Sequence, residues 1–136
     1  MVTYFEKKRM TKSLHILVVD DEPDVVEIIT YNLLKANYTV QRAYNGQQCL
    51  EVARIRKPDL IIMDIRMPVM NGIEACRELR KNVELNNIPV LFLTADSDEY
   101  TTISAFDAGG NHFITKPIRP SLLILLIQEI VSEKKI

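Results

Sequence analysis

The chain has 136 residues, 17 Lys and Arg against 18 Asp and Glu, a net charge of -1 and 47% hydrophobic residues. This composition predicts one neutral globular domain whose core needs neither a disulfide scaffold nor a structural metal. It argues against direct binding of nucleic acids, because contact with a phosphate backbone requires a clustered excess of Lys and Arg.

Short apolar runs alternate with helical patterns through the first half of the chain. Residues 15–19 form an apolar run rich in β-branched residues, which ends at Asp20 and predicts a strand buried on both faces. Pro23 suits the first turn of a helix, and apolar residues at helical spacing continue to about residue 36. The next predicted segments are a strand, a helix and a second buried strand, at residues 38–43, 47–56 and 59–64.

The second half repeats the alternation. The predicted segments are a helix at 73–82, a strand at 88–93, a helix capped by Ser97 that runs to about residue 108, a strand at 112–115 and a helix at about 120–134. Five strand–helix units in strict alternation imply a parallel sheet with right-handed crossovers and helices on both faces. The predicted fold class is therefore a doubly wound α/β domain.

Polar residues follow the predicted strands at their carboxyl ends, where ligands bind in doubly wound folds. They are Asp20, Asp21, Asp64, Thr94 and Lys116. Three carboxylates at one edge repel one another unless a cation lies among them, and oxygen ligands without His or Cys favour a hard ion such as Mg²⁺. Asp64 is the best nucleophile toward phosphorus, since it ends the central strand. Thr94 and Lys116 add a hydroxyl and an ammonium for phosphoryl oxygens.

Four short motifs in chain order resemble the receiver domain of bacterial two-component response regulators. They are Val18-Val19-Asp20-Asp21-Glu22, Met63-Asp64-Ile65-Arg66-Met67-Pro68 with Asn71-Gly72, Leu93-Thr94-Ala95, and Thr115-Lys116-Pro117. Thr94 lies 30 residues after Asp64, and Lys116 lies 52 residues after it. The resemblance covers about residues 14–133 and implies a flavodoxin-like (βα)5 fold with strand order 2-1-3-4-5.

The resemblance also implies the roles of individual residues. Asp64 would accept a phosphoryl group from a sensor histidine kinase or a phosphotransfer protein. Mg²⁺ or Mn²⁺ would be bound by Asp21, Asp64 and the backbone carbonyl of Arg66, with Asp20 acting largely through water. The family's cis peptide bond would precede Pro117. The protein would be a signalling domain rather than an enzyme, catalysing only its own phosphorylation and its slow dephosphorylation.

A two-state switch is a further implication of the resemblance. Thr94 would move toward the phosphoryl group and Phe113 would swing inward, which would remodel the face formed by the helix ending near residue 108, the strand 112–115 and the helix 120–134. The family commonly has Tyr at the position of Phe113, so a contact made by the Tyr hydroxyl is absent here. The alternative that Phe113 is an ordinary core residue of its strand stays open.

The last predicted helix carries more apolar residues than one face can hold. Leu122, Leu123, Leu126, Ile127 and Ile130 fill one helical face. Ile124 and Leu125 fall outside that face and predict an exposed apolar surface for a homodimer through the switching face. The alternative is that a curved core absorbs both residues.

One segment departs from the family pattern, and one pair of residues near the site carries a further hypothesis. Gly109-Gly110-Asn111-His112 replaces the common Gly-Ala-Asp-Asp, and the second glycine is expected to loosen the turn before the last strand. Arg66 and Asp96 are hypothesised to pair across the mouth of the site and to slow the attack of water on the acyl phosphate. Independent solvation of these two side chains is the alternative.

Two other functional classes fit the sequence less well. A phosphatase of the haloacid dehalogenase type has a second acid two residues after its nucleophile, where this chain has Arg66. A flavodoxin-like cofactor binder needs a phosphate-binding loop after the first strand, where Asp20, Asp21 and Glu22 would repel phosphate.

The expected domain organisation is a flexible tail at residues 1–13, which holds the basic run 7–9, and a receiver domain at 14–134, with no output domain in this chain. The output, such as a winged-helix DNA-binding domain, would belong to a longer regulator, or the receiver would act alone on other proteins. Cys49 and Cys76 lack metal-ligand spacing and are expected to be free. A cytoplasmic location with no membrane partner is expected, because the chain has neither an export signal nor the roughly 20-residue apolar run that crosses a bilayer.

Overall fold

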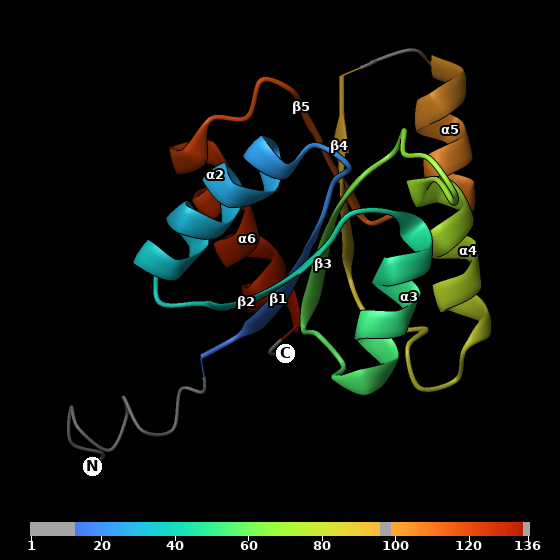
Figure 1. The fold of residues 1–136 in the computed structure, drawn as a ribbon, viewed down its shortest axis with the longest axis horizontal. Helices are drawn as coiled ribbons and strands as arrows, with labels where there is room; N and C mark the ends of the chain where they lie inside the picture. The colour runs from blue at the N-terminus through green and yellow to red at the C-terminus, as the bar shows by residue number, and fades with distance from the viewer. Residues whose placement is uncertain (1–12, 96–98, 135–136) are drawn as a thin grey trace.

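The computed structural model describes residues 13–95 and 99–134, and these form alternating strands and helices (Figure 1). The strands are β1 (His15–Val19), β2 (Thr39–Ala43), β3 (Leu60–Asp64), β4 (Val90–Thr94) and β5 (His112–Thr115). The helices are α2 (Pro23–Lys35), α3 (Gly46–Ile55), α4 (Gly72–Lys81), α5 (Glu99–Asp107) and α6 (Pro120–Lys134).

The strands form one parallel sheet in the order β2-β1-β3-β4-β5, which confirms the predicted doubly wound, flavodoxin-like topology. Strands β1, β3 and β4 are buried along their whole length, as their continuous apolar runs predict. Predicted and observed element bounds differ by at most two residues. The largest difference is at β4, which begins at Val90 because Pro89 has no N–H group to donate to the sheet. Ser97, the predicted helix cap, lies outside the described residues.

The helices cover both faces of the sheet. Figure 1 shows α2 and α6 on one face and α3, α4 and α5 on the other. Each layer encloses its own buried apolar cluster, one around Leu33, Ile62 and Ile127 and the other around Ile61, Leu79 and Phe92. Since both faces are covered, only the ends of the strands are open to ligands. No helix in the described ranges is long and apolar enough to span a membrane.

Asparagine side chains define the first residues of two helices. Asn45 Oδ1 accepts a hydrogen bond from the Gln48 N–H at 2.9 Å and caps α3. Asn71 and Glu74 form a reciprocal capping box at the start of α4. Both helices therefore begin at the glycine after the cap, one residue before the predicted start.

The expectation that the turn before β5 is loose is wrong. Gly109 has a φ of 100°, and its carbonyl accepts a hydrogen bond from Arg80 Nη2 at 2.7 Å. Asn111 N–H donates to the carbonyl of Val90 at 3.0 Å. The absence of a side chain at Gly109 leaves room for Arg80, so the turn is held by a residue of α4 instead of being freed.

The prediction that Ile124 and Leu125 of α6 form an exposed apolar surface is also partly wrong. Leu125 is 59% exposed, as expected, but the second exposed leucine is Leu122, at 48%. Ile124 is half-buried and packs against the core cluster that includes Leu33 of α2. The cause is the packing of α2 against α6, which covers a side of the last helix that an ideal helical pattern leaves outside.

Candidate functional site

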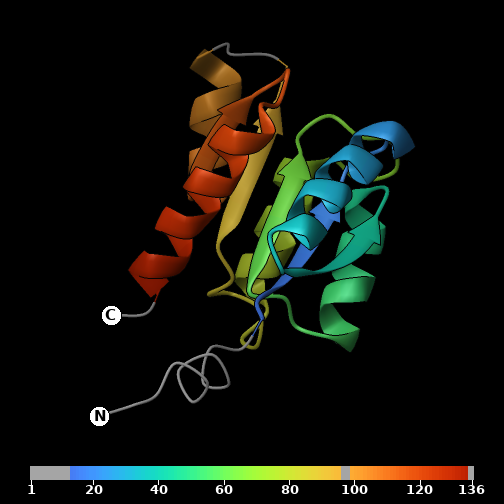
Figure 2. The same cartoon turned by 90° about the vertical axis from the view of Figure 1, so that its left-hand side faces the viewer.

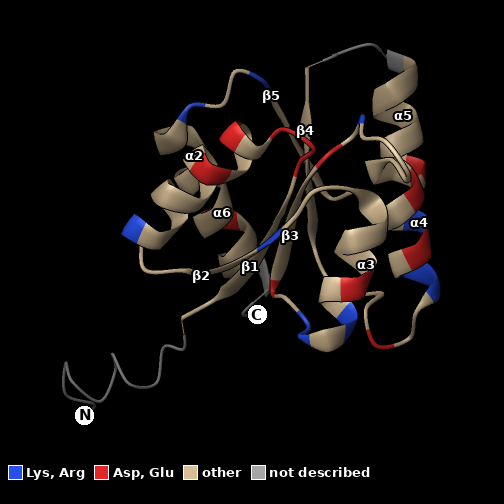
Figure 3. Cartoon of the chain, viewed as in Figure 1, with Lys and Arg blue, Asp and Glu red and all other residues tan. Residues whose placement is uncertain are grey.

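The predicted site residues meet at the carboxyl ends of four strands, where acidic residues gather in Figure 3. Asp20 follows β1, Asp64 and Thr94 are the last residues of β3 and β4, and Lys116 follows β5. Asp64, Thr94 and Lys116 line a cavity of about 180 Å³. The residues that line it are Asp21, Glu22, Asp64, Ile65, Arg66, Thr94, Ala95 and Lys116.

Three carboxylates lie within metal-binding reach of one another. Asp20, Asp21 and Asp64 each offer an oxygen, and these oxygens all lie within 4.8 Å of one another. Asp20 is completely buried and Asp64 is 6% exposed, whereas Asp21 is open to solvent. A hydrogen bond of 3.0 Å from the Glu22 N–H fixes Asp20 Oδ1. Oxygen donors of this kind, without His or Cys among them, suit a hard divalent cation such as Mg²⁺.

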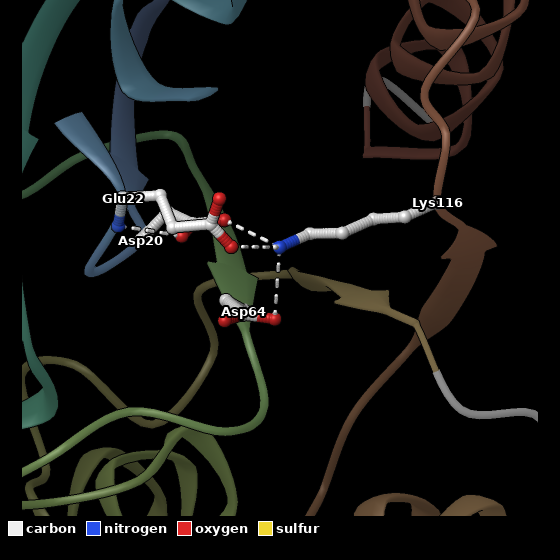
Figure 4. Close-up of polar contacts among 4 residues, drawn as sticks. All are labelled: Asp20, Glu22, Asp64 and Lys116. Atoms are coloured by element: carbon white, nitrogen blue, oxygen red, sulfur yellow. Dashed lines mark hydrogen bonds and ion pairs between the residues drawn. The ribbon is translucent and has the colours of Figure 1, made fainter. Parts of the chain in front are cut away.

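Lys116 reaches across the site from the end of β5 (Figure 4). Its Nζ lies 2.9 Å from Asp20 Oδ2 and 3.5 Å from Asp64 Oδ1. The more distant Glu22 Oε1 lies 3.9 Å away. One ammonium thus offsets part of the repulsion between two buried carboxylates, but it cannot neutralise both.

Burial and neighbouring charges shift the pKa values of Asp64 and Lys116. Burial, followed by the charge of Asp20, raises the pKa of Asp64 from 3.8 to about 6, although Lys116 opposes this rise. Burial alone lowers the pKa of Lys116, but its contacts with Asp20, Asp64 and Glu22 outweigh burial and raise that pKa above its ordinary value. At neutral pH the lysine is therefore a cation, and Asp64 is an ionised carboxylate held in an unfavourable environment.

The loop after Asp64 is fixed through its backbone. The Gly72 N–H donates to the Ile65 carbonyl at 2.8 Å, and a Cβ at Gly72 would lie 2.2 Å from the Asp64 carbonyl oxygen. Only glycine permits this approach. Within the loop, Val69 is the centre of a γ-turn with a φ of 70°, closed by the Met70 N–H and the Pro68 carbonyl at 2.8 Å.

The predicted switch residues lie on neighbouring strands. Thr94 is 6% exposed and lines the cavity, and the Lys116 N–H donates to its carbonyl at 2.8 Å. Phe113 is half-buried, with its ring centroid 5.7 Å from that of Phe92 and 4.4 Å from that of Phe106. Phe113 thus lies between the core of the sheet and helix α5.

Two remaining sequence predictions have different outcomes. The peptide bond between Lys116 and Pro117 is cis, as the resemblance implies. Asp96 lies outside the described residues, so its pairing with Arg66 stays a hypothesis. The sequence did not predict that the carboxylate of Glu22 would face Lys116 in the site. Its position directly after the Asp20–Asp21 pair was the available signal.

Comparison with known proteins decides the family. Residues 16–128 match the response regulator receiver domain. The chain belongs to this family. Receiver domains are signalling modules of two-component systems.

The similar proteins have names that refer to different processes. The chain is 36% identical over 121 residues to the alkaline phosphatase synthesis transcriptional regulatory protein PhoP of Bacillus subtilis, covering 89% of this chain and 50% of that protein. It resembles the crystal structure of the receiver domain of a signal transduction histidine kinase from Syntrophus aciditrophicus, with a TM-score of 0.83, 32% identity, and coverage of 89% of this chain and 92% of that one. A chemotaxis response regulator of Vibrio cholerae matches with a TM-score of 0.83 and 28% identity, over 88% of this chain and 99% of that one.

The receiver therefore spans half the length of its Bacillus relative. The three similar proteins share the receiver but are named for transcription, for a histidine kinase and for chemotaxis. Membership of the family consequently defines the module without defining its output.

Proposed function

We propose that Asp64 is the phosphoacceptor of this receiver and takes its phosphoryl group from the phosphohistidine of a sensor kinase or a phosphotransfer protein. A carboxylate oxygen of Asp64 forms a bond to phosphorus, and the bond from phosphorus to the histidine nitrogen breaks. The imidazole leaves with the electron pair of that bond and takes up a proton. The product is an acyl phosphate on Asp64.

The contact of the Lys116 ammonium with Asp64, beside two further carboxylates, is the observation that supports this proposal most. The acid cluster fits Mg²⁺ because its three oxygens converge and nitrogen and sulfur ligands are absent from it. Asp21, Asp64 and the backbone carbonyl of Arg66 would hold the ion, with Asp20 acting through water. When bound, the ion would neutralise charge that develops on the phosphoryl oxygens.

The other site residues would act on the phosphoryl group directly. Lys116 Nζ lies 3.5 Å from Asp64 Oδ1 and would pair with one phosphoryl oxygen. Thr94 lines the same cavity and would donate its hydroxyl hydrogen to another. The burial of Asp20 and Asp64 would strengthen these interactions, because charges interact more strongly away from water.

Intact mass measurement after incubation with acetyl phosphate and Mg²⁺ tests the proposal. The parent and an Asp107→Ala variant should each gain one phosphoryl group, whereas Asp64→Ala should gain none. Asp107 is a matched control because it is an exposed aspartate at the end of α5, away from the cavity. Equal labelling of Asp64→Ala and the parent would refute the assignment of Asp64.

We further propose that phosphorylation switches the face formed by α5, β5 and α6, through Thr94 and Phe113. Figure 2 shows α5 and α6 at the β5 edge of the sheet. Five large apolar residues on these two helices are exposed: Tyr100, Ile103, Phe106, Leu122 and Leu125. Such a surface favours a homodimer through this face in the phosphorylated state.

Sedimentation with and without beryllofluoride, a phosphate mimic, tests the dimer. The parent should dimerise when the mimic is bound, and a double Leu122→Ser, Leu125→Ser variant should stay monomeric. Ile55→Ser on α3 is the control, because it removes an 85% exposed isoleucine from a helix that is not part of the proposed dimer face. A parent that sediments as a monomer in both conditions would contradict the proposed dimer.

For the output, we propose control of transcription by a DNA-binding domain of a longer regulator. The supporting observation is the name of the Bacillus relative, a transcriptional regulatory protein of which this chain matches half. Basic residues are scattered over several elements of the receiver (Figure 3), which argues against a nucleic-acid surface on the described residues themselves. Expression of the complete gene product, followed by a DNA-binding assay with and without phosphorylation, tests this proposal.

A further inference from the structure

Arg80, in the last turn of α4, bonds through every N–H group of its guanidinium. Nε and Nη2 both donate to the Gly109 carbonyl, at 3.1 and 2.7 Å. Nη1 donates to the carbonyls of Asn86 and Ile88, at 3.2 and 2.8 Å, and Nη2 also donates to Asn111 Oδ1 at 3.1 Å. A guanidinium has five N–H donors. One side chain therefore joins three segments: the end of α4, the residues before β4, and the turn between α5 and β5.

The turn is shaped to receive this side chain. Gly109 has a φ of 100°, and a Cβ there would lie 2.6 Å from Arg80 Nε. A Cβ at the next residue, Gly110, would lie 2.5 Å from Cε2 of Phe92. The two glycines thus let the turn approach Arg80 on one side and the core of the sheet on the other. None of the acceptors of Arg80 is a carboxylate, so the fork of the guanidinium serves to hold backbone and amide groups rather than to form an ion pair.

Asn111 extends this connection to the sheet. Its N–H donates to the Val90 carbonyl at 3.0 Å, and its Oδ1 accepts from the Val90 N–H at 2.8 Å as well as from Arg80. Both backbone polar groups of Val90, the first residue of β4, are therefore hydrogen-bonded to Asn111, the residue before β5. From there the pairing of the two strands continues in register, from Leu91 beside His112 to Thr94 beside Thr115.

This arrangement determines where β5 delivers its functional residues. The strand has four residues, and Lys116 follows directly after it. At the far end, the Lys116 N–H bonds to the Thr94 carbonyl. A displacement of the first residues of so short a strand moves its last residues too, and with them the ammonium that lies 3.5 Å from Asp64.

We propose that Arg80 is a positioning residue for phosphoryl transfer, which fixes the start of β5 and thereby sets the reach of Lys116 to Asp64. The proposal rests on the proposed function of Asp64 as phosphoacceptor. Arg80 is not among the residues that line the cavity or form the acid cluster, so it acts on the site through the segments that it joins, and the turn before β5 is the one that leads to Lys116.

The test compares Arg80→Gln with Arg77→Gln, which removes the same charge from an exposed position of the same helix. The initial rate of Asp64 phosphorylation by acetyl phosphate at saturating Mg²⁺ should fall about ten- to a hundredfold in Arg80→Gln, the scale of loss caused by a misplaced reacting group. The Kd for Mg²⁺, measured by calorimetry, should stay within about twofold of the parent, because the acid cluster lies on β1 and β3. Arg77→Gln should match the parent in both measurements.

Two further measurements separate positioning from a merely structural role. Amide hydrogen exchange should accelerate in β5 of Arg80→Gln while β1 and β3 keep their protection, whereas general destabilisation would accelerate exchange across the sheet. Asn111→Asp keeps the acceptor for Arg80 and for the Val90 N–H and should phosphorylate at the parent rate. Asn111→Leu lacks that acceptor and should be phosphorylated more slowly. If Arg80→Gln fails to fold, the comparison of these two Asn111 variants tests the positioning role instead.

The two proposals fail in different ways. If Asp64 is phosphorylated in the parent and a folded Arg80→Gln variant reacts at the same rate, the positioning role is refuted and the phosphoacceptor role stands. Equal rates for Asn111→Leu and Asn111→Asp would likewise refute the positioning role. If the parent gains no phosphoryl group on Asp64, the proposed function itself fails.

Discussion

Replacing Asp64 with the uncharged isostere Asn should stabilise the protein in the absence of Mg²⁺. Burial and the neighbouring Asp20 raise the pKa of Asp64 from 3.8 to about 6. One pKa unit corresponds to about 1.36 kcal/mol, so the ionised carboxylate lowers the free energy of unfolding by about 3 kcal/mol at pH values well above 6. Asp64→Asn should recover about that amount at pH 7.5.

The pH dependence of the gain follows from the direction of the shift. Between pH 3.8 and about 6 the folded state of the parent binds more protons than its unfolded state, so parent stability falls as the pH rises through this window. The advantage of Asp64→Asn should therefore shrink to about 1 kcal/mol at pH 4.5 and vanish at lower pH. Added Mg²⁺ should stabilise the parent but not the variant, which narrows the gap at pH 7.5.

Urea denaturation in EDTA, followed by circular dichroism at both pH values, measures these differences. Glu129→Gln is the control, because it neutralises an exposed carboxylate on α6 and should change the free energy of unfolding by less than about 0.5 kcal/mol. If Asp64→Asn gains no more free energy of unfolding over the parent at pH 7.5 than at pH 4.5, the electrostatic reasoning is refuted. A loss of stability in Asp64→Asn would show that the pairing with Lys116 outweighs the cost of burial.

Three other substitutions test local features by the same denaturation assay. Val69→Asn should add about 1 kcal/mol, because Asn tolerates the positive φ of 70° better than a β-branched residue does, and Val83→Asn, at an exposed position without positive φ, should add nothing. Thr30→Val should also add about 1 kcal/mol, since the Thr30 hydroxyl is buried without a hydrogen-bond partner among the described residues; a loss would reveal a missed partner. Gly110→Ala should cost about 1–3 kcal/mol through its clash with Phe92, and a neutral result would mean that the ring can move aside.

The fold could be predicted from the sequence because the apolar runs, the helical patterns and the polar residues after the strands all indicate the same parallel sheet. The buried parallel strands appear in the sequence as continuous apolar runs. Asp20 directly follows β1, and Asp64 and Thr94 are the last residues of β3 and β4. In a parallel sheet the carboxyl ends of all strands lie at one edge, so the meeting of these residues follows from the topology. The contact of Lys116 with Asp64 follows in the same way, once β5 is placed beside β4.

Contacts between side chains and distant backbone could not be predicted in this way. A glycine pair shows where side chains are missing, but it does not show that Arg80, 29 residues earlier, fills the space beside Gly109. Similarly, helical periodicity divides α6 into faces without showing which face α2 covers. Ile124 was therefore expected to be exposed, and Leu122 to be buried, with the opposite result.

Strand β5 connects the acidic site to the aromatic contact with α5. Its residue Phe113 packs against Phe106 of α5, while Lys116, three residues further along, pairs with the acids of the site. A phosphoryl group on Asp64 would add negative charge beside the Lys116 ammonium and change the force on the end of the strand. Because Arg80 holds the start of β5, a response to that force would be confined to the residues between, which include Phe113. The ring of Phe113 thus lies between the site, at the end of β5, and the exposed Phe106 of α5.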